Sequence, residues 1–310
     1  MKLPRIVFAG TPDFAVPSLE ALLRAGLPVV GVITQPDRRS GRGRRLTAPP
    51  VKQCAEAHQV PVLQPARLSQ ELAPLVALEP DVLVVVAYGQ LLSQAVLDIP
   101  TCETLNVHAS LLPRWRGAAP IQRAIEAGDA STGVAIMRVV LELDAGPVYR
   151  MGETPIDPRD TTASVHDRLA NMGGALLLET IESLDKAQPT AQDPSLVTYA
   201  SRLQKSEAQV DWSASAQEIE RRIRAFNPRP ICDTGLEGEV DRIRLWEAQL
   251  SPVANSDSPA GTVLAANAKG IDVQTGAGVL RLTRLQSPGR KPLGAGEFLQ
   301  GRALLDRRLT

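Results

Sequence analysis

The first half of the chain alternates short apolar runs with longer segments in which apolar residues recur every three or four positions. The short runs predict buried β-strands, and the longer periodicity predicts amphipathic helices. The strands are expected at Arg5–Gly10, Val29–Thr34, Val60–Leu63, Asp81–Ala87, Thr104–Val107 and Gly133–Val140. The helices are expected at Asp13–Ala25, Val51–His58, Gln70–Leu78, Pro120–Ala127 and Thr161–Leu184. This alternation predicts an α/β fold with a Rossmann-like, doubly wound parallel sheet.

The run Asp81–Ala87 carries the strongest strand pattern in the chain. Its continuous valine and leucine content is typical of a strand buried on both faces of a parallel sheet. Ligands of such sheets bind beyond the carboxyl ends of the strands. The segments Ala87–Leu92 (AYGQLL) and Asn106–Ser110 (NVHAS) each follow or end a predicted strand, so both are expected at this edge.

The pattern changes after residue 185. The stretch Asp185–Ser195 is polar with two prolines, which is typical of a linker. A helix is expected next, with Ser213 or Ser215 as its N-cap. Short strand patterns then recur at roughly 8–12-residue spacing, which predicts a smaller C-terminal β-barrel of the OB type. The expected division is a catalytic domain over residues 1–189, a linker over 190–207 and a C-terminal domain over 208–310.

Composition narrows the possible classes of protein. The 310 residues are 44% hydrophobic and 22% charged with zero formal net charge, so any surface that attracts nucleic acid must be local. The three cysteines lie far apart, outside any CxxC spacing, which favours a reducing compartment. The chain has no apolar run of about 18 residues, so no membrane span is expected. The N-terminus resembles neither a signal nor a transit peptide, so we expect a cytoplasmic protein.

The stretch NVHASLLPRWRGAAP, from Asn106 to Pro120, carries the candidate chemistry. Asn106 and His108 are separated by one residue, so in an extended strand they point to the same side. A neutral amide donor beside an imidazole suits an oxyanion that develops on a carbonyl carbon. A site of this kind also needs a carboxylate to hold the imidazole, and Asp144 in LELDAGP is the candidate. From these residues alone, a structural histidine and an ordinary turn-forming asparagine remain equally plausible.

Other motifs exclude some chemistries. The segment Gly10–Asp13 follows the first strand but does not match GxGxxG, and the chain has neither a Walker A nor a GxSxG sequence. Neither a metal nor a nicotinamide is suggested. Between Arg38 and Arg45, five arginines alternate with serine and glycines; such a run is often a solvated surface, but it also suits RNA phosphates and stacked bases.

The motifs occur in the same order as in methionyl-tRNA formyltransferases, and the chain resembles that family from about residue 5 to about residue 302. The resemblance implies transfer of a formyl group from 10-formyltetrahydrofolate to the α-amine of methionyl initiator tRNA. The segments that carry it are AGTPDFA (9–15), TQPDRRSGRGRRL (34–46), VVVAYGQLL (84–92), NVHASLLPRWRGAAPIQ (106–122), LDAG (143–146) and RAFNPRP (224–230).

The resemblance also implies roles for individual residues. Asn106 and His108 match the pair that stabilises the oxyanion, and Asp144 matches the carboxylate that supports the imidazole and helps to move protons. Residues implied to contact the folate are Val86, Tyr88, Gly89, Ser110, Leu111, Leu112 and Pro113. Residues implied to enter the tRNA acceptor end are Arg38, Arg39, Arg42, Arg44 and Arg45, with Arg42 foremost. Basic residues between 281 and 308 are expected to grip the tRNA backbone.

The chain departs from the family pattern at three places. Glu142 stands where glycine usually precedes LDxG, Arg229 stands before Pro230 where tryptophan is usual, and Ala109 stands where glycine is common. Two rival readings are another formyl-folate enzyme with the same site and a non-catalytic RNA-binding protein. The partners expected are the tRNA and the folate, with no membrane and no obligate protein partner, so the chain is expected to act as a monomer.

Overall fold

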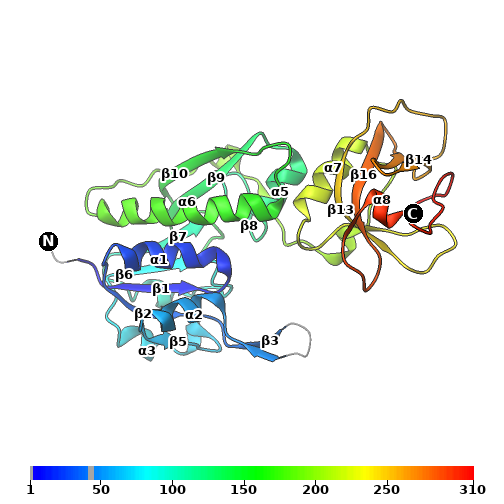
Figure 1. The fold of residues 1–310 in the computed structure, drawn as a ribbon. Helices are drawn as coiled ribbons and strands as arrows, with labels where there is room; N and C mark the ends of the chain where they lie inside the picture. The colour runs from blue at the N-terminus through cyan, green and yellow to red at the C-terminus, as the bar shows by residue number, and fades with distance from the viewer. Residues whose placement is uncertain (1–2, 41–44) are drawn as a thin grey trace. The chain divides into compact units, whose positions relative to one another are not determined.

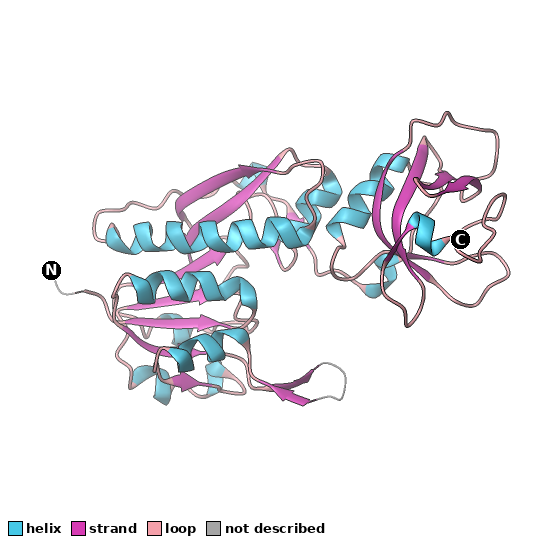
Figure 2. Ribbon diagram, viewed as in Figure 1, coloured by secondary structure: helices cyan, strands magenta, loops and turns pink. Residues whose placement is uncertain are grey.

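A computed structural model describes residues 3–40 and 45–310 of the chain. The chain forms two compact units. The first comprises the chain up to Pro120 together with Ser131–Pro155 and His166–Ala200. The second comprises Ile121–Ala130, Ile156–Val165 and Ser201–Thr310. Helices alternate with strands in the first unit, and strands dominate the C-terminal part of the second (Figure 2).

The first unit is built on a seven-stranded sheet in the order β10-β9-β7-β6-β1-β2-β5. The strands β7, β6, β1, β2 and β5 are parallel, whereas β9 runs antiparallel to β7 and β10 antiparallel to β9. The sheet is therefore mostly parallel with an antiparallel edge. The strands are β1 (Ile6–Gly10), β2 (Val29–Ile33), β5 (Val62–Leu63), β6 (Val82–Val86), β7 (Glu103–His108), β9 (Ser131–Arg138) and β10 (Val148–Pro155).

Helices α1 (Val16–Arg24) and α6 (Thr162–Glu182) cover one face of this sheet (Figure 1). Two glycines of α6 allow close packing, Gly173 against β7 and Gly174 against α1. A Cβ added at Gly173 would lie 2.8 Å from Val107 Cγ1, and one at Gly174 would lie 2.8 Å from the Pro17 carbonyl oxygen. Val107 therefore faces α6. Because neighbours along a strand alternate sides, Asn106 and His108 face the opposite way.

The opposite face carries a second part of the core around Tyr88, Leu68, Leu75 and Val96, which are essentially inaccessible to solvent. Tyr88 follows β6, and the other three side chains come from short elements rather than long helices. They are the 3-10 turn Leu68–Gln70, α3 (Ala73–Val76) and α4 (Gln94–Leu97), while α2 (Pro50–Ala57) precedes β5. Two small ribbons complete the unit: β3 (Arg38–Ser40) with β4 (Arg45–Thr47), and β8 (Arg116–Gly117) with β11 (Tyr199–Ala200).

The C-terminal part of the second unit is an antiparallel sheet in the order β12-β13-β16-β15-β14, with β17 paired to β16. The last residues of the chain bond to both edges of this sheet. Leu309 N–H donates to the Gly261 carbonyl at 2.8 Å beside β14, and Thr310 N–H donates to the Gly235 carbonyl at 3.1 Å beside β12. The strands are β12 (Asp233–Thr234), β13 (Ile243–Leu250), β14 (Val263–Asn267), β15 (Gly270–Gln274), β16 (Val279–Gln286) and β17 (Leu293–Gly294); α8 is Ala295–Phe298.

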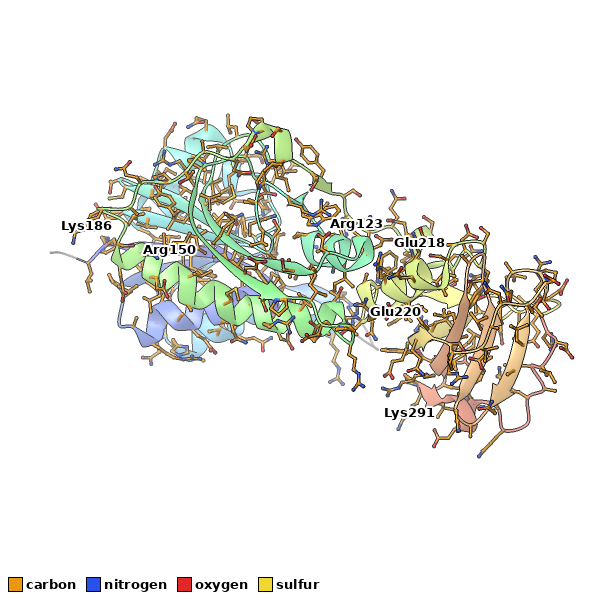
Figure 3. The ribbon with its side chains drawn as sticks, turned by 90° about the horizontal axis from the view of Figure 1, so that it is seen from above. Arg123, Arg150, Lys186, Glu218, Glu220 and Lys291 are labelled. Carbon is orange, nitrogen blue, oxygen red and sulfur yellow. The ribbon has the colours of Figure 1, made fainter. Side chains whose placement is uncertain are left out.

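Two helices of the second unit are joined by charged side chains. Arg123 of α5 (Pro120–Ala127) pairs with Glu126 at 2.7 Å and with Glu207 at 2.8 Å, and Arg222 of α7 (Ala216–Ala225) pairs with Glu126 at 3.0 Å. The shared Glu126 links the helices, and each of these pairs lies partly sheltered from solvent, where screening is weaker. Arg123 and the α7 residues Glu218 and Glu220 are labelled in Figure 3.

Most predicted elements are confirmed, with specific corrections. Ser215 rather than Ser213 caps α7: its hydroxyl accepts from Glu218 N–H, and Glu218 returns the bond to the Ser215 backbone. The helix expected at Gln70–Leu78 is only a 3-10 turn and a single turn of α-helix. The strand Val148–Pro155 was not predicted, because its side chains are mostly polar or half-exposed and show no apolar alternation. Among the described residues, every helix falls short of the length and apolar character that a membrane crossing requires.

Candidate active site

The carboxyl ends of β1, β2, β6 and β7 meet at one edge of the sheet. The Thr11 hydroxyl, just after β1, donates to the Tyr88 carbonyl at 2.9 Å, and Gln35 Nε2, after β2, donates to the same oxygen at 3.3 Å. His108 is the last residue of β7. The polar residues that follow these strands therefore gather at the place where doubly wound sheets bind ligands.

Asn106 and His108 lie on one face of β7 beside an apolar floor. In the register of the sheet, Asn106 pairs with Met137 and His108 with Ala135 on β9. Ala135 and Met137 form a buried cluster with Leu112 and Val148. This cluster lies on the same face as Asn106 and His108, so two polar side chains project beside a water-excluding surface.

The imidazole of His108 is buried, with 6% of the residue exposed, and is hydrogen-bonded at one nitrogen while the other faces a carboxylate. Nε2 lies 2.9 Å from the carbonyl oxygen of Trp115. A carbonyl can only accept a hydrogen bond, so Nε2 carries a proton. Nδ1 then faces Asp144, whose Oδ2 is 3.7 Å away. The proton on Nε2 leaves Nδ1 as the nitrogen that can gain or release a proton.

Asp144 lies in the loop between β9 and β10 in a strained conformation. Its φ of +48° is in the left-handed region, which an L-residue other than glycine rarely adopts. Oδ2 accepts a hydrogen bond from the Gly117 N–H at 2.8 Å. The side chain is only 15% exposed. The Gly117 N–H holds the carboxylate oxygen close to the imidazole, because a hydrogen bond to a charged acceptor is stronger than one to a neutral acceptor.

Asn106 completes the group. Its residue is half-buried, and its side chain makes no hydrogen bond to another residue within the part of the chain that the structure describes. Its amide donor is therefore available to a ligand. A neutral amide, an imidazole nitrogen and a carboxylate at one sheet edge match what stabilisation of an oxyanion and transfer of one proton require.

The residues implied to contact a folate divide into buried and accessible ones. Val86, Tyr88 and Ser110 are essentially inaccessible, and the Ser110 hydroxyl donates to the Arg114 carbonyl at 2.6 Å. Burial, with a smaller effect of the Glu71 charge, raises the pKa of the Tyr88 phenol to about 12, so it stays neutral near pH 7. Gly89 is exposed with a φ of +84°. Leu112 belongs to the buried cluster, while Leu111 and Pro113 are half-buried.

The two ends of the arginine-rich segment pair as the antiparallel strands β3 and β4, where the sequence predicted only a loop. Arg38 and Arg39 on β3 and Arg45 on β4 are exposed, while Arg42 and Arg44 lie outside the described residues.

The base of this hairpin is anchored by a polar cluster. Lys52 Nζ lies 2.9 Å from an Asp37 carboxylate oxygen, and Gln64 Nε2 donates to the same carboxylate at 2.7 Å. The hydrogen bonds from Gln64 and Lys52 hold the pKa of the Asp37 carboxyl below its usual value. Arg38 also donates to Gln35 Oε1 at 3.1 Å, so the hairpin is tied to the sheet edge that carries the candidate site.

The contacts around the site join residues far apart in the sequence: Gln192 lies outside the motif segments, whereas Arg116 lies within one of them. Gln192 donates to the carbonyls of Asp144 and Gly146, and Arg116 donates both to Gln192 and to Glu142. These partners lie between 26 and 76 positions apart along the chain, so no local pattern links them. The ion pair with Arg116 gives Glu142, which departs from the family pattern, a place in the structure: its carboxylate lies 3.1 Å from Arg116 Nη1. In the described part of the chain, no three His, Cys, Asp or Glu side chains gather as metal ligands.

Comparison with known families matches both parts of the chain. Residues 4–181 match the formyl transferase family, and residues 202–303 match the formyl transferase C-terminal domain. The chain is 51% identical over 309 residues to the methionyl-tRNA formyltransferase of Methylococcus capsulatus, covering 98% of this chain and 99% of that protein. It is 52% identical over 301 residues to the methionyl-tRNA formyltransferase of Marinobacter nauticus, covering 96% of each.

Solved structures with low sequence identity share the fold. The sugar 3N-formyl transferase WlaRD is 16% identical with a TM-score of 0.68, over 94% of this chain and 100% of that one. HypX from Aquifex aeolicus, solved in complex with tetrahydrofolic acid, is 19% identical with a TM-score of 0.62. The match covers 97% of this chain but only 48% of HypX, so the chain spans about half the length of that protein.

The backbone around Gly146 leaves no room for a side chain, which gives a first test of the loop. A Cβ at this position would lie 1.9 Å from the Arg138 carbonyl oxygen. We expect Gly146→Ala to lower the free energy of unfolding by about 1–3 kcal/mol, because backbone must move to admit the methyl group. Urea denaturation measures this change. Gly294→Ala is the matched control, since a Cβ there meets nothing within 4 Å. Equal stability of the two variants would show that the loop yields freely and that Gly146 does not fix it.

Proposed function

The chain belongs to the methionyl-tRNA formyltransferase family, and from that premise we propose that it transfers the formyl group of 10-formyltetrahydrofolate to the α-amine of methionyl initiator tRNA. The observation that supports this chemistry most directly is the position of Asp144 Oδ2, 3.7 Å from His108 Nδ1, on a sheet edge that also carries the unbonded amide of Asn106. A protein that only binds RNA has no need of these three groups together.

The proposed reaction assigns one role to each group. The α-amine of the methionyl ester attacks the formyl carbon, forming the new C–N bond while the carbonyl π electrons move to oxygen. The Asn106 amide and a protonated His108 Nδ1 stabilise this oxyanion. Such stabilisation is usually the largest single contribution to the rate in a site of this type. Asp144 accepts the proton lost by the attacking nitrogen, and His108 gives its Nδ1 proton to N10 of the folate. The oxyanion electrons then reform the C=O bond as the old C–N bond breaks and tetrahydrofolate leaves, and the proton on Asp144 returns to His108.

We propose that the folate lies along the segments 86–89 and 110–113. The side chains of Val86, Tyr88 and Ser110 are buried, so these residues contribute main-chain groups and a rigid wall rather than side-chain hydrogen bonds. The φ values of +47° at Ala87 and +84° at Gly89 turn the chain at the end of β6. An apolar slot with a few backbone hydrogen bonds suits a pterin ring.

We propose that the arginine segment 38–45 contacts the acceptor end of the tRNA. Arg38, Arg39 and Arg45 stand exposed on a hairpin whose base is fixed by the Lys52–Asp37 pair. Guanidinium groups bind phosphates in a bidentate way and stack on bases. The anchored base limits the conformational entropy that the segment loses on binding, which favours affinity.

The C-terminal unit is proposed to supply the remaining grip on tRNA. Of its basic residues, Arg281 pairs with buried Asp272 at 2.7 Å and Arg284 pairs with Glu247 at 3.1 Å, so both are locally neutralised. Arg290 and Lys291, in the exposed turn between β16 and β17, are better placed to meet a phosphate backbone. Lys291 is labelled in Figure 3.

We further propose that the C-terminal sheet works as an OB-like barrel. The hydrogen bonds of the segment 307–310 to both sheet edges support this closure, because they bridge β14 to β12 through one short piece of chain. The proposed division into a catalytic domain 1–189, a linker 190–207 and a C-terminal domain 208–310 follows the same scheme. Since Asn106, His108 and Asp144 all come from the first unit of one chain, we propose a monomer, acting in the cytoplasm where initiator tRNA is used.

Formyl transfer itself tests the proposed function. The purified protein is mixed with 10-formyltetrahydrofolate and charged initiator methionyl-tRNA, and formyl-methionine is assayed. His108→Ala should lower kcat by about 10²–10⁴-fold, because it removes both the proton carrier and an oxyanion donor. His58→Ala should leave kcat unchanged, since His58 is exposed and its ring, among the described residues, bonds only the Cys54 carbonyl of α2. Absence of product from the wild type, with tRNA still bound, would mean that the chain is a binding protein.

The role of the arginine segment is tested separately. Arg42→Ala should raise KM for the charged tRNA by about tenfold or more and leave KM for the folate within about twofold, since one lost phosphate contact costs about 1–3 kcal/mol. Steady-state kinetics with each substrate varied in turn measures both constants. Arg150→Ala, which removes an exposed arginine from β10, is the matched control. An equal rise of both KM values for Arg42→Ala would contradict the assigned role.

A further inference from the structure

The carboxylate at the candidate site is carried by a turn that has a left-handed residue and little hydrogen bonding of its own. Asp144 has a φ of +48°, and such a conformation costs a non-glycine residue roughly 1–3 kcal/mol, so surrounding contacts must maintain it. Within the turn itself, the Ala145 N–H reaches the Glu142 carbonyl only at 3.3 Å. The rest of the support comes from outside the turn.

Gln192 supplies that support, from a position 48 residues further along the chain. Its Nε2 donates to the carbonyl oxygen of Asp144 at 2.8 Å and to that of Gly146 at 2.7 Å. The two bonds use both hydrogens of the amide and span the turn. The side chain thereby fixes the backbone on both sides of Ala145, immediately beside the carboxylate that faces His108.

Buried Arg116 sets the orientation of the Gln192 amide. Arg116 is only 5% exposed, and its Nε donates to Gln192 Oε1 at 3.1 Å. The guanidinium can only donate and the two carbonyls can only accept, so chemistry alone decides which end of the amide faces which partner. Arg116 is fixed in turn by Glu142, 3.1 Å from its Nη1, which closes a ring of contacts around the turn.

The chain segment that carries Gln192 also supports the imidazole. Thr198 Oγ1 accepts a hydrogen bond from the Trp115 N–H at 2.9 Å, and the Arg116 N–H donates to the Thr198 carbonyl at 2.9 Å. Trp115, with a φ of +66°, presents the carbonyl that accepts from His108 Nε2. The segment 190–200 therefore holds both partners of the His108–Asp144 pair, one through Trp115 and the other through Gln192.

We propose that Gln192 is a positioning residue of the formyl-transfer site, which acts by fixing Asp144 against His108 while touching neither substrate. The inference rests on the proposed function and extends it to a residue outside the motif segments. Without the amide, two backbone carbonyls and the Arg116 Nε lose their partners, and the turn relaxes toward ordinary backbone conformations. A displacement of the carboxylate by about 1 Å is enough to cost on the order of 10²-fold in rate.

The test compares Gln192→Leu, which keeps the size of the side chain but removes its hydrogen bonds, with Gln188→Leu. Gln188 is an exposed glutamine of the same connecting segment. Single-turnover formyl transfer and steady-state kinetics are measured for each. Gln192→Leu should lower kcat about 10–100-fold with KM for tRNA and folate changed less than about threefold, and Gln188→Leu should match the wild type. Unchanged kcat in Gln192→Leu would overturn the proposal.

A double-mutant cycle with Asp144→Asn separates positioning from a general loss of stability. If Gln192 acts through the carboxylate, Gln192→Leu should cost less than about threefold further once Asp144→Asn is present. A full additional loss would overturn the proposal, as would a loss of kcat that disappears when rates are divided by the folded fraction from circular dichroism. Should Gln192→Leu fold poorly, Gln192→Glu replaces it in the cycle, because it keeps an acceptor for Arg116 and removes both donors, although it also adds a negative charge.

The two proposals fail in distinguishable ways. If the wild type forms no formyl-methionyl-tRNA, the proposed function is wrong and the role of Gln192 falls with it. If the wild type is active and the cycle is additive, the function stands and Gln192 is only a structural residue.

Discussion

The hydrogen bond between His108 Nε2 and the Trp115 carbonyl is the interaction on which the rest of the site depends. A carbonyl accepts and cannot donate, so this one contact, at 2.9 Å, decides that Nε2 is protonated and that Nδ1 is the nitrogen with variable protonation. Nδ1 is also the nitrogen that faces Asp144. The sequence suggested that the carboxylate would fix the tautomer; in the structure, a backbone carbonyl does so, and the carboxylate acts on the other side of the ring.

The geometry around this bond follows from the fold in several steps. A parallel core brings the carboxyl ends of β1, β2, β6 and β7 to one edge, and β7 presents Asn106 and His108 on the face away from α6. The loops that reach His108 then contain left-handed residues, at Trp115 and Asp144. Backbone strain of this kind persists only when packing and hydrogen bonds outweigh it, and here the segment 190–200 supplies those bonds. The sheet presents Asn106 and His108 of the candidate site on β7, and a strained loop presents Asp144.

Sequence patterns predicted the parts of this arrangement that depend on local physics. The continuous valine and leucine run predicted β6, the serines before the amphipathic pattern predicted the cap of α7 as either Ser213 or Ser215, and the separation of Asn106 from His108 predicted their common face. The parts that escaped prediction rest on contacts between distant segments. Gln192 has no local signature, because its partners are backbone carbonyls and an arginine 76 residues away. The edge strand β10 escaped because its own sequence does not alternate apolar and polar residues. The hydrogen bonds of the segment 307–310 to both sheet edges run largely between backbone groups, which leave no side-chain pattern in the sequence.

The central claim is that the Asp144 carboxylate serves the chemical step rather than the fold. Single-turnover formyl transfer with Asp144→Asn tests it most directly. The asparagine keeps an oxygen for the Gly117 N–H but has no charge and no proton affinity, so the rate of the chemical step should fall by about 10²–10⁴-fold while folate and tRNA bind as in the wild type. Exposed Asp185→Asn is the control and should keep the full rate. A chemical step in Asp144→Asn that proceeds at the wild-type rate would contradict this account.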